Sequence, residues 1–145
     1  MRYPAVASSL KEGWTLAFRD FPELVLTGAK PSLLLPRATQ ALARRLSGCL
    51  LDGDLPPRPS NRFRLLRNQR LLLIPIEVTL SLQISLRWAR ADAGLTQAQL
   101  AERTGFSQPQ IARIERPGAH PKLESIAKLA AAMGLRIEAT LARRD

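Results

Sequence analysis

Residues 94–115 read GLTQAQLAERTGFSQPQIARIE and contain the same helix-start signal twice. In each copy a Thr or Ser is followed three residues later by Gln. The pairs are Thr96 with Gln99, and Ser107 with Gln110. This spacing predicts a capping box, in which each side chain binds the backbone N–H of the other residue. Gly105, between the copies, tolerates the left-handed turn at a helix end. We therefore predict short helices at about 97–104 and 108–116, joined by a tight turn.

The apolar residues of this stretch fall where two crossing helices need them. Ala101 is small enough to let the second helix pass closely, and Leu100, Ile111 and Ile114 supply a shared core. Pro109 is tolerated because the first N–H groups of a helix have no partner within it. An αα-hairpin in an ordinary helical bundle is the alternative interpretation. The spacing of the capping residues, the small alanine, the turn glycine and the apolar residues, taken together, favours a helix-turn-helix. The second helix of such a motif enters the major groove of double-stranded DNA.

Residues 94–115, with 121–126 and 133–134, resemble the Xre/lambda-type repressor family. The resemblance implies that the second helix reads bases and that the first helix contacts a phosphate at its N-terminus. The implied DNA-binding residues are Gln97, Ser107, Gln108, Pro109, Gln110 and Arg113. Their chemistry is suitable, because Gln pairs with adenine, Arg pairs with guanine and helix N-termini bind phosphate. The resemblance also implies a structural ion pair between Arg90 and Glu115.

The charge of the chain supports an anionic partner. The 145 residues carry a formal net charge of +10, which favours nucleic acid or a membrane surface. No signal peptide and no membrane-spanning apolar run is evident, so we expect a cytoplasmic protein without a membrane partner. The middle of the chain has the densest basic run, with Arg62, Arg64, Arg67 and Arg70. Their spacing fits a solvated face and a phosphate-contacting connector equally well.

A proline-rich break at 53–60 indicates two domains, at 1–79 and 80–145. The first domain is predicted as three strands, a helix, the proline linker and a fourth strand. The expected elements are strands at 3–8, 14–18 and 24–27, a helix at 32–51 and a strand at 71–74. Pro36 should lie in the first turn of that helix or mark where it begins. The single Cys49 is expected to be a small buried hydrophobe.

Two further segments follow less decisive patterns. Residues 76–88 alternate as in a strand but also carry helical spacing, and we favour a helix from about Leu80. After an amphipathic helix ending near Gly134, residues 135–141 alternate as a half-buried strand. A lone strand needs a partner edge, which is either the first domain or a second copy. We predict a homodimer or higher homo-oligomer.

Residues 1–28 and the linker at 51–60 resemble the HicB antitoxin family. The resemblance implies an α+β chain, with a small partial ribonuclease H-like αβ domain before an all-α helix-turn-helix domain and its C-terminal strand. It also implies an antitoxin that neutralises a HicA-like mRNA interferase toxin and represses its own operon. The segment at 29–35 lacks the acidic residues usual in that family. The alternative is a stand-alone Xre-family regulator whose first domain dimerises or senses a ligand.

The first domain offers contact residues but no convincing catalytic set. The predicted toxin-binding residues are Trp14, Phe18, Asp20, Phe21 and Glu23. Aromatic residues are favoured interface anchors, although core packing explains each of them equally well. A ribonuclease H site needs carboxylates that converge on divalent metal, whereas those of residues 1–79 lie mostly in predicted turns. We expect no enzyme activity, no cofactor and no metal site, since His120 also lacks neighbouring ligands.

Overall fold

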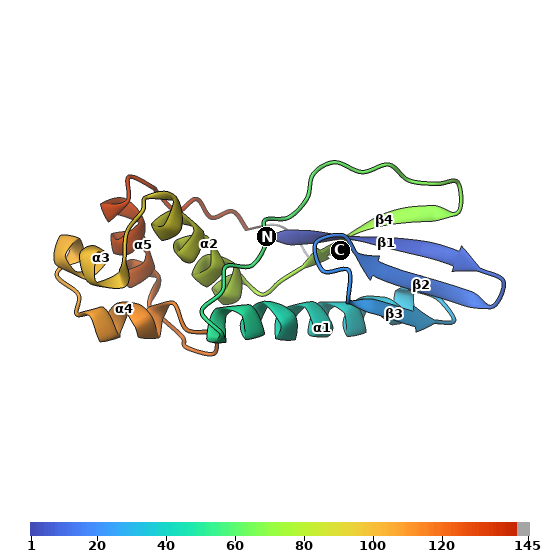
Figure 1. Cartoon of the computed structure of the whole chain (residues 1–145), viewed down its shortest axis with the longest axis horizontal. Helices are drawn as coiled ribbons and strands as arrows, with labels where there is room; N and C mark the ends of the chain where they lie inside the picture. The colour runs from blue at the N-terminus through green and yellow to red at the C-terminus, as the bar shows by residue number, and fades with distance from the viewer. Residues whose placement is uncertain (142–145) are drawn as a thin grey trace. The chain divides into compact units, whose positions relative to one another are not determined.

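The first 75 residues form a four-stranded antiparallel sheet (Figure 1). The strands are β1 (Arg2–Leu10), β2 (Gly13–Phe18), β3 (Val25–Gly28) and β4 (Gln69–Pro75), in the order β3-β2-β1-β4. The register pairs Ala7 of β1 with Leu16 of β2 and with Arg70 of β4. All four strands expected from the sequence are therefore confirmed: β1, β2 and β4 are slightly longer than predicted, and β3 is shifted by one residue.

One face of this sheet is covered by helix α1 (Pro31–Leu51). The residues that the two elements bury completely are Tyr3, Ala5, Ala7, Leu16 and Ile74 from the strands, and Leu34, Ala38, Leu42 and Leu46 from α1. The four helical positions recur every four residues, which places them on one side of the helix. Cys49 is buried as expected. This apolar layer is the core of the first unit.

Pro36 lies inside α1 instead of at its start, which corrects the sequence expectation. The helix begins five residues earlier, where Pro31 occupies the first turn. Proline removes one backbone N–H and crowds the carbonyl four residues before it. The helix nevertheless continues, because its apolar side is packed against the sheet on both sides of Pro36. Tertiary packing has thus outweighed a local helix-breaking residue.

The second half of the chain is helical. Its elements are α2 (Val78–Asp92), α3 (Gln97–Thr104), α4 (Gln108–Ile114) and α5 (Leu123–Ala132). The ambiguous stretch at 76–88 is helical from Val78, because the Glu77 carboxylate accepts hydrogen bonds from the N–H groups of Thr79 and Leu80, both at 2.9 Å. These bonds satisfy two of the N–H groups that a helix start leaves unpaired.

A single apolar core joins α3, α4 and α5 to the second half of α2. Its buried members are Leu86, Leu95, Leu100, Ala101, Ile111, Ile114, Ile126 and Leu129. Leu100, Ile111 and Ile114 were expected to form this core from their spacing, and Ala101 lies where the helices pass. The core therefore orients the two helices of the predicted motif.

The strand predicted at 135–141 is absent from the structure, in which residues 134–141 are irregular. After α5, the N–H of Leu135 donates to the carbonyl of Ala130 at 2.9 Å, which closes the helix. Ile137 then packs against the core of the second unit. A strand needs a hydrogen-bonded neighbour, and among the described residues none of the strands β1 to β4 pairs with this segment. Residues 142–145 lie outside the described part of the chain.

The structure describes residues 1–141 of the chain, which divides into two units at Ser81 and Leu82. The α+β class is confirmed at the level of a mixed fold with a four-stranded sheet and five helices. The finer likeness to a partial ribonuclease H fold stays a prediction. Among the described residues, every helix is too short or too polar to cross a membrane.

Candidate nucleic-acid interface

Both predicted capping boxes are present at the starts of α3 and α4. The Thr96 hydroxyl accepts from the N–H of Gln99 at 3.1 Å, and Gln99 Oε1 accepts from the N–H of Thr96 at 2.8 Å. Ser107 and Gln110 repeat the arrangement at 3.3 and 2.7 Å. Gly105, with φ at 72°, makes the left-handed turn between them. Local sequence therefore fixes where each helix of the motif begins.

Helix α4 presents a polar side to solvent. Its buried residues, Ile111 and Ile114, face the core. The predicted DNA contacts at its start and on its outer side are exposed: Ser107, Gln108, Pro109, Gln110 and Arg113. The structure thus brings these five residues together on one surface, where a base edge or a phosphate can approach them.

The side chains of this surface differ in how much of their bonding capacity is already used. Ser107 and the Oε1 atom of Gln110 are engaged in the capping box. Bidentate pairing of Gln with adenine needs both amide atoms, so this bond restricts Gln110 to donating from Nε2. In the described part of the chain, no carboxylate pairs with the Arg113 guanidinium. Arg113 is therefore the residue of this surface best placed for a bidentate contact with guanine.

Gln97 links the start of α4 to the interior. Its Oε1 accepts from Gln108 Nε2 at 2.9 Å, and its Nε2 donates to Glu115 Oε2 at 3.1 Å. The sequence assigned Gln97 a phosphate contact, which stays a prediction. The structure gives it a second task, because its amide holds the first residue of α4 in place. Gln108 is consequently positioned by a chain of hydrogen bonds that ends on a buried carboxylate.

That carboxylate, Glu115, is only 1% exposed in its side chain and lies between two arginines. Arg90 donates from Nε to Oε1 at 2.7 Å and from a terminal nitrogen to Oε2 at 2.9 Å. A further guanidinium nitrogen of Arg90 donates to the carbonyl of Leu95 at 3.0 Å. The bidentate pair joins α2 to the end of α4, and two parallel N–H···O bonds fix its geometry.

Two residues of this network were missed by sequence reasoning. Arg87 places Nε 3.6 Å from Glu115 Oε2 without a hydrogen bond, and burial lowers its pKa while Glu115 opposes that shift. Gln83, which is buried, donates to the carbonyls of Ile114 at 3.1 Å and Arg116 at 2.7 Å. Spacing within α2 was the available signal, because residues 83, 87 and 90 recur at helical intervals.

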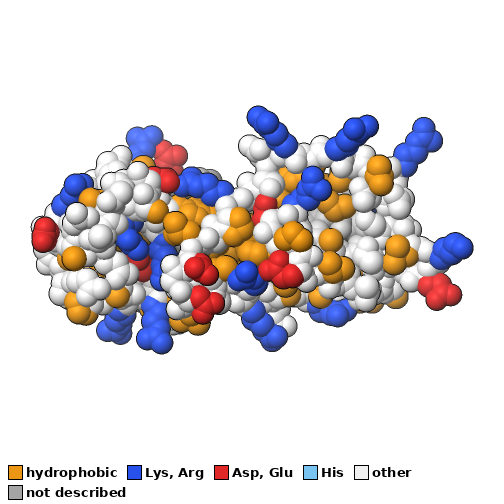
Figure 2. Space-filling model, in the orientation of Figure 1, with side chains coloured by type: hydrophobic (Ala, Val, Ile, Leu, Met, Phe, Trp, Pro, Cys, Tyr) orange, Lys and Arg blue, Asp and Glu red, His pale blue; other side chains and the backbone are white. Residues whose placement is uncertain are grey.

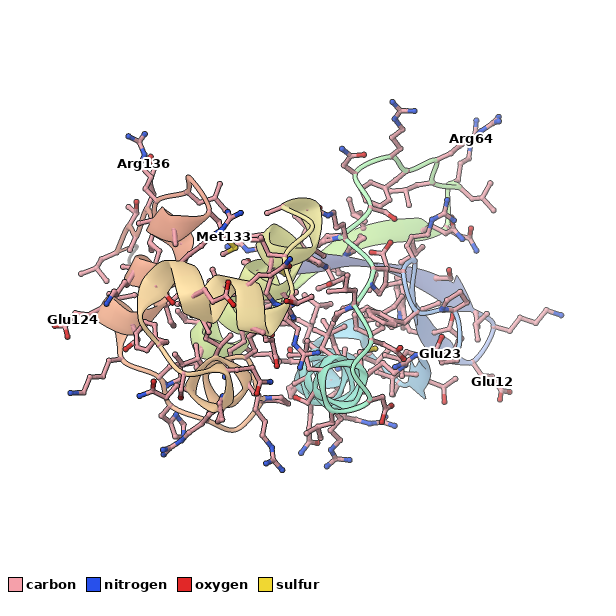
Figure 3. The ribbon with its side chains drawn as sticks, turned by 60° about the vertical axis from the view of Figure 1, so that its left-hand side comes forward. Glu12, Glu23, Arg64, Glu124, Met133 and Arg136 are labelled. Atoms are coloured by element: carbon pink, nitrogen blue, oxygen red, sulfur yellow. The ribbon has the colours of Figure 1, made fainter. Side chains whose placement is uncertain are left out.

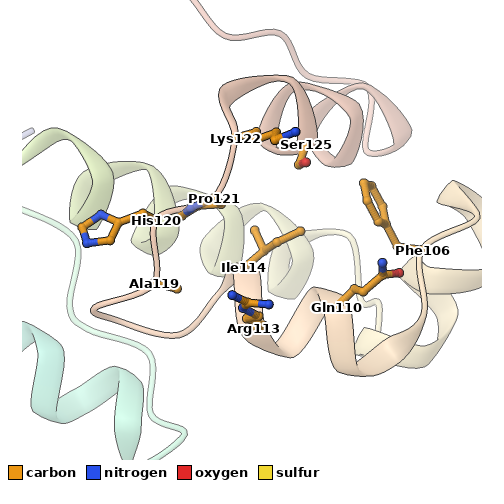
Figure 4. Close-up of a pocket in the computed structure, with 9 residues that line it drawn as sticks. All are labelled: Phe106, Gln110, Arg113, Ile114, Ala119, His120, Pro121, Lys122 and Ser125. Atoms are coloured by element: carbon orange, nitrogen blue, oxygen red, sulfur yellow. The ribbon is translucent and has the colours of Figure 1, made fainter.

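A hollow of about 420 Å³ lies beside α4, between its outer side and the start of α5 (Figure 4). Gln110, Arg113, His120 and Lys122 contribute its nitrogen-bearing side chains. Phe106 supplies an aromatic wall, and Lys128 lies over its ring at 5.1 Å. A phosphate group fits this setting, because cationic side chains and amides are the groups that contact DNA backbones.

The five residues predicted to bind a toxin do not form one exposed surface. Phe18 and Phe21 are 3% and 2% exposed, so they belong to the core and the sequence assignment is corrected for both. Asp20 accepts hydrogen bonds from Ser60 and holds the linker. Glu23, labelled in Figure 3, pairs with Arg45 at 2.7 Å, and this hydrogen bond lowers the pKa of Glu23. Trp14 remains half-buried, beneath Arg70.

The two capped helices, the left-handed turn and the exposed polar side of α4 together define a helix-turn-helix protein. The helix-turn-helix family model matches residues 86–139, which span these elements. A helix-turn-helix transcriptional regulator of Haemophilus influenzae, itself uncharacterized, is 44% identical over 46 residues, covering 32% of this chain and 47% of the regulator.

Similarity beyond this domain reaches HicB antitoxins. Antitoxin HicB 1 of Photorhabdus laumondii subsp. laumondii is 27% identical over 135 residues, covering 92% of this chain and 83% of its own length. Antitoxin HicB of Escherichia coli strain K12 is 26% identical over 135 residues, covering 92% of this chain and 94% of its own length. The resemblance to HicB-type antitoxins with a C-terminal helix-turn-helix is therefore confirmed.

Replacing Glu115 should destabilise the second unit strongly. In Glu115→Ala two guanidiniums lose their buried partner, so we expect a loss of about 3–5 kcal/mol in unfolding free energy. The matched control is Glu138→Ala, because Glu138 pairs with Arg136 on the surface and both side chains are highly exposed. The control should change stability by less than about 1 kcal/mol. Thermal and urea unfolding measure both variants, and equal stability of the two would contradict the assignment.

Proposed function

We propose that the chain is the antitoxin of a toxin-antitoxin pair, which binds operator DNA through α4 and neutralises a HicA-like mRNA interferase. The observation that carries this proposal is the exposed polar side of α4, anchored by Glu115, in a chain similar to HicB antitoxins over 92% of its length. Binding to the operator represses the antitoxin's own operon.

Arg113 and Gln108 are the base-reading residues in this proposal. Both are exposed on α4, and Gln108 is held by Gln97. Ser107, Pro109 and Gln110 border them, with Pro109 able to contact a thymine methyl and Gln110 Nε2 able to donate. Phosphate contacts from Gln97 and from the hollow beside α4 set the register of the helix in the groove.

Replacing Arg113 should alter which sequences are bound. Arg113→Ala removes a bidentate guanine contact, so discrimination at one base position should fall by about 1–3 kcal/mol. Gln97→Ala should weaken all sites, because it loses a phosphate contact and releases Gln108. Arg103→Ala is the matched control, as Arg103 is exposed in the last turn of α3 and is not among the predicted contact residues. Binding to a panel of single-base operator variants measures the ranking, and an unchanged ranking in Arg113→Ala would refute the assignment.

A two-fold homodimer is part of the proposal, since paired helix-turn-helix units match palindromic operators. Residues 135–141 alternate in polarity, and Leu135 and Leu141 are exposed. The same segment of a second copy would supply the hydrogen-bonding edge and cover these side chains.

Charges in this segment should dissociate the dimer. We expect Leu135→Asp combined with Leu141→Asp to sediment as a monomer and to lose operator affinity, because carboxylates would be buried at the interface. Leu123→Asp is the control, since Leu123 is an exposed leucine at the start of α5. Sedimentation velocity at low micromolar concentration measures the state. A double variant that stays dimeric would place the interface elsewhere.

The toxin contact is proposed on the sheet face that α1 leaves uncovered. The register places Val6, Ala17, Val25 and Leu71 in one row across the sheet, with Leu73 on the same side. Val25 and Leu73 are 54% and 50% exposed. An apolar contact suits two basic partners, since like charges across an interface repel. Large exposed apolar groups of this kind mark protein interaction surfaces.

Co-expression with any small gene found beside the gene for this chain tests neutralisation. Expressed by itself, that gene should arrest growth, and co-expression of the wild-type chain should restore growth. Arg113→Ala should still rescue, because DNA reading is separate from the sheet face. Val25→Arg combined with Leu73→Arg should fail to rescue and to co-purify with the toxin. Leu33→Arg with Leu51→Arg is the matched control, placing the same charges on exposed positions of α1.

The outcome of this experiment also decides between two functions. If no neighbouring gene is toxic, the chain is better described as a stand-alone transcriptional regulator. The local similarity to the Haemophilus influenzae regulator favours that second candidate. Rescue that survives the sheet-face variant but fails in Arg113→Ala would likewise contradict the antitoxin proposal.

A further inference from the structure

The linker before β4 carries a concentrated positive charge that the helix-turn-helix does not use. Between residues 55 and 76 the chain has five arginines and no carboxylate. Three of them, Arg62, Arg64 and Arg67, are exposed, and in the described part of the chain no carboxylate pairs with them. We call residues 61–68 the arginine segment. Figure 2 shows Lys and Arg side chains projecting along the edge where Figure 1 draws this linker, and Figure 3 labels Arg64 there.

The arginine segment is held at both ends, although it has no regular secondary structure. Ahead of it, the Tyr3 hydroxyl donates to the carbonyl of Pro57 at 2.7 Å. Asp20 accepts from the N–H of Ser60 at 3.1 Å. At its far end, the N–H of Ser9 donates to the carbonyl of Asn68 at 3.1 Å. Fixed ends reduce the entropy that a binding partner must remove, which favours a presented contact surface.

We propose that the arginine segment binds the phosphate backbone of double-stranded DNA that flanks the operator. This inference rests on the proposed function, in which α4 reads the operator. From Arg62 to Arg67 the chain spans at most about 17 Å. One DNA strand carries about five phosphates over that length. Three guanidiniums spread over this distance can each contact a different phosphate of a DNA strand, whereas a single small anion could contact only one or two of them.

Double-stranded DNA is the favoured anion because the arginine segment and α4, which is proposed to bind DNA, belong to one chain. Once α4 is bound, the arginine segment meets flanking DNA as an intramolecular event with a high effective concentration. A membrane is a weaker match, because the segment is irregular and does not form the amphipathic helix that lies on bilayers. Of the apolar side chains within it, Leu65 and Leu66 are exposed and Phe63 is half-buried.

The test compares DNA of two lengths. A duplex selected from a random pool by the full-length chain serves as the short probe, and the same duplex with 15 added base pairs on each side serves as the long probe. The variant is Arg62→Ala, Arg64→Ala and Arg67→Ala together. Arg70 is retained because it lies over the Trp14 ring at 5.7 Å. Fluorescence anisotropy from 50 to 200 mM NaCl gives the affinity and its salt dependence.

The variant should lose at least about tenfold in affinity for the long probe, with a much smaller loss on the short one. The slope of log affinity against log salt on the long probe should fall by about 2–3, since each phosphate contact contributes about 0.9. The control is Arg2→Ala, Lys11→Ala and Lys30→Ala together, which removes the same charge from exposed positions of the same unit. The control should retain at least half of the extra affinity that the wild-type chain has for the long probe over the short one.

Three results would overturn the inference. The first is that the variant and the wild-type chain bind the long probe equally well. The second is that both triple variants lose the same affinity for it. The third is that the variant loses affinity only for single-stranded RNA or for phosphatidylserine vesicles. Failure of the proposed function looks different, because the wild-type chain would then select no duplex. Melting curves of both triple variants establish that each is folded, which their exposed positions lead us to expect.

Discussion

A single buried carboxylate organises the helix-turn-helix. Glu115 ends α4, pairs bidentately with Arg90 of α2 and accepts from Gln97 at the start of α3. Three helices are therefore held through one side chain that solvent scarcely reaches. Burial of a carboxylate is costly unless every lone pair is satisfied, so the arrangement is specific: a shift of any of these helices would leave charge uncompensated in the core.

The network extends from this carboxylate to the surface of α4 that is proposed to contact DNA. Gln97 uses one amide atom on Glu115 and the other on Gln108, so the orientation of the first α4 residue depends on the interior ion pair. Gln83 adds a second constraint by donating to the carbonyl of Ile114, the last residue of α4, and to that of Arg116 just beyond it. The reading helix is consequently fixed at its start and its end, while the apolar core fixes its inner side. Arg113 is left exposed on a rigid support.

Sequence reasoning succeeded where short-range chemistry decides the structure. Capping boxes and Gly105 depend on neighbours within four residues, and strand alternation needs only a buried face, so both were predictable. The family resemblance implied the pair of Arg90 with Glu115. Helical spacing places Arg87 on the same side of α2 as Arg90, but its position beside Glu115 depends on how α2 packs. Phe18 and Phe21 were assigned to a surface, because the large apolar residues of a core and of an interface look alike in sequence. The strand at 135–141 failed for a different reason, as strand formation requires an edge outside the segment.

The positive charge of the chain has to be reconciled with the proposed toxin partner, which would handle RNA and would be basic itself. Different side chains supply the two contacts within the first unit, although Arg64 lines a hollow together with Val6 and Ala17 of the apolar row. The exposed row on the uncovered sheet face is apolar, whereas the arginines are concentrated in the linker that precedes β4. Phosphate contacts draw their energy from charge and weaken with salt, while apolar burial does not depend on charge. Binding to toxin through the apolar row should therefore resist salt concentrations that release the chain from DNA.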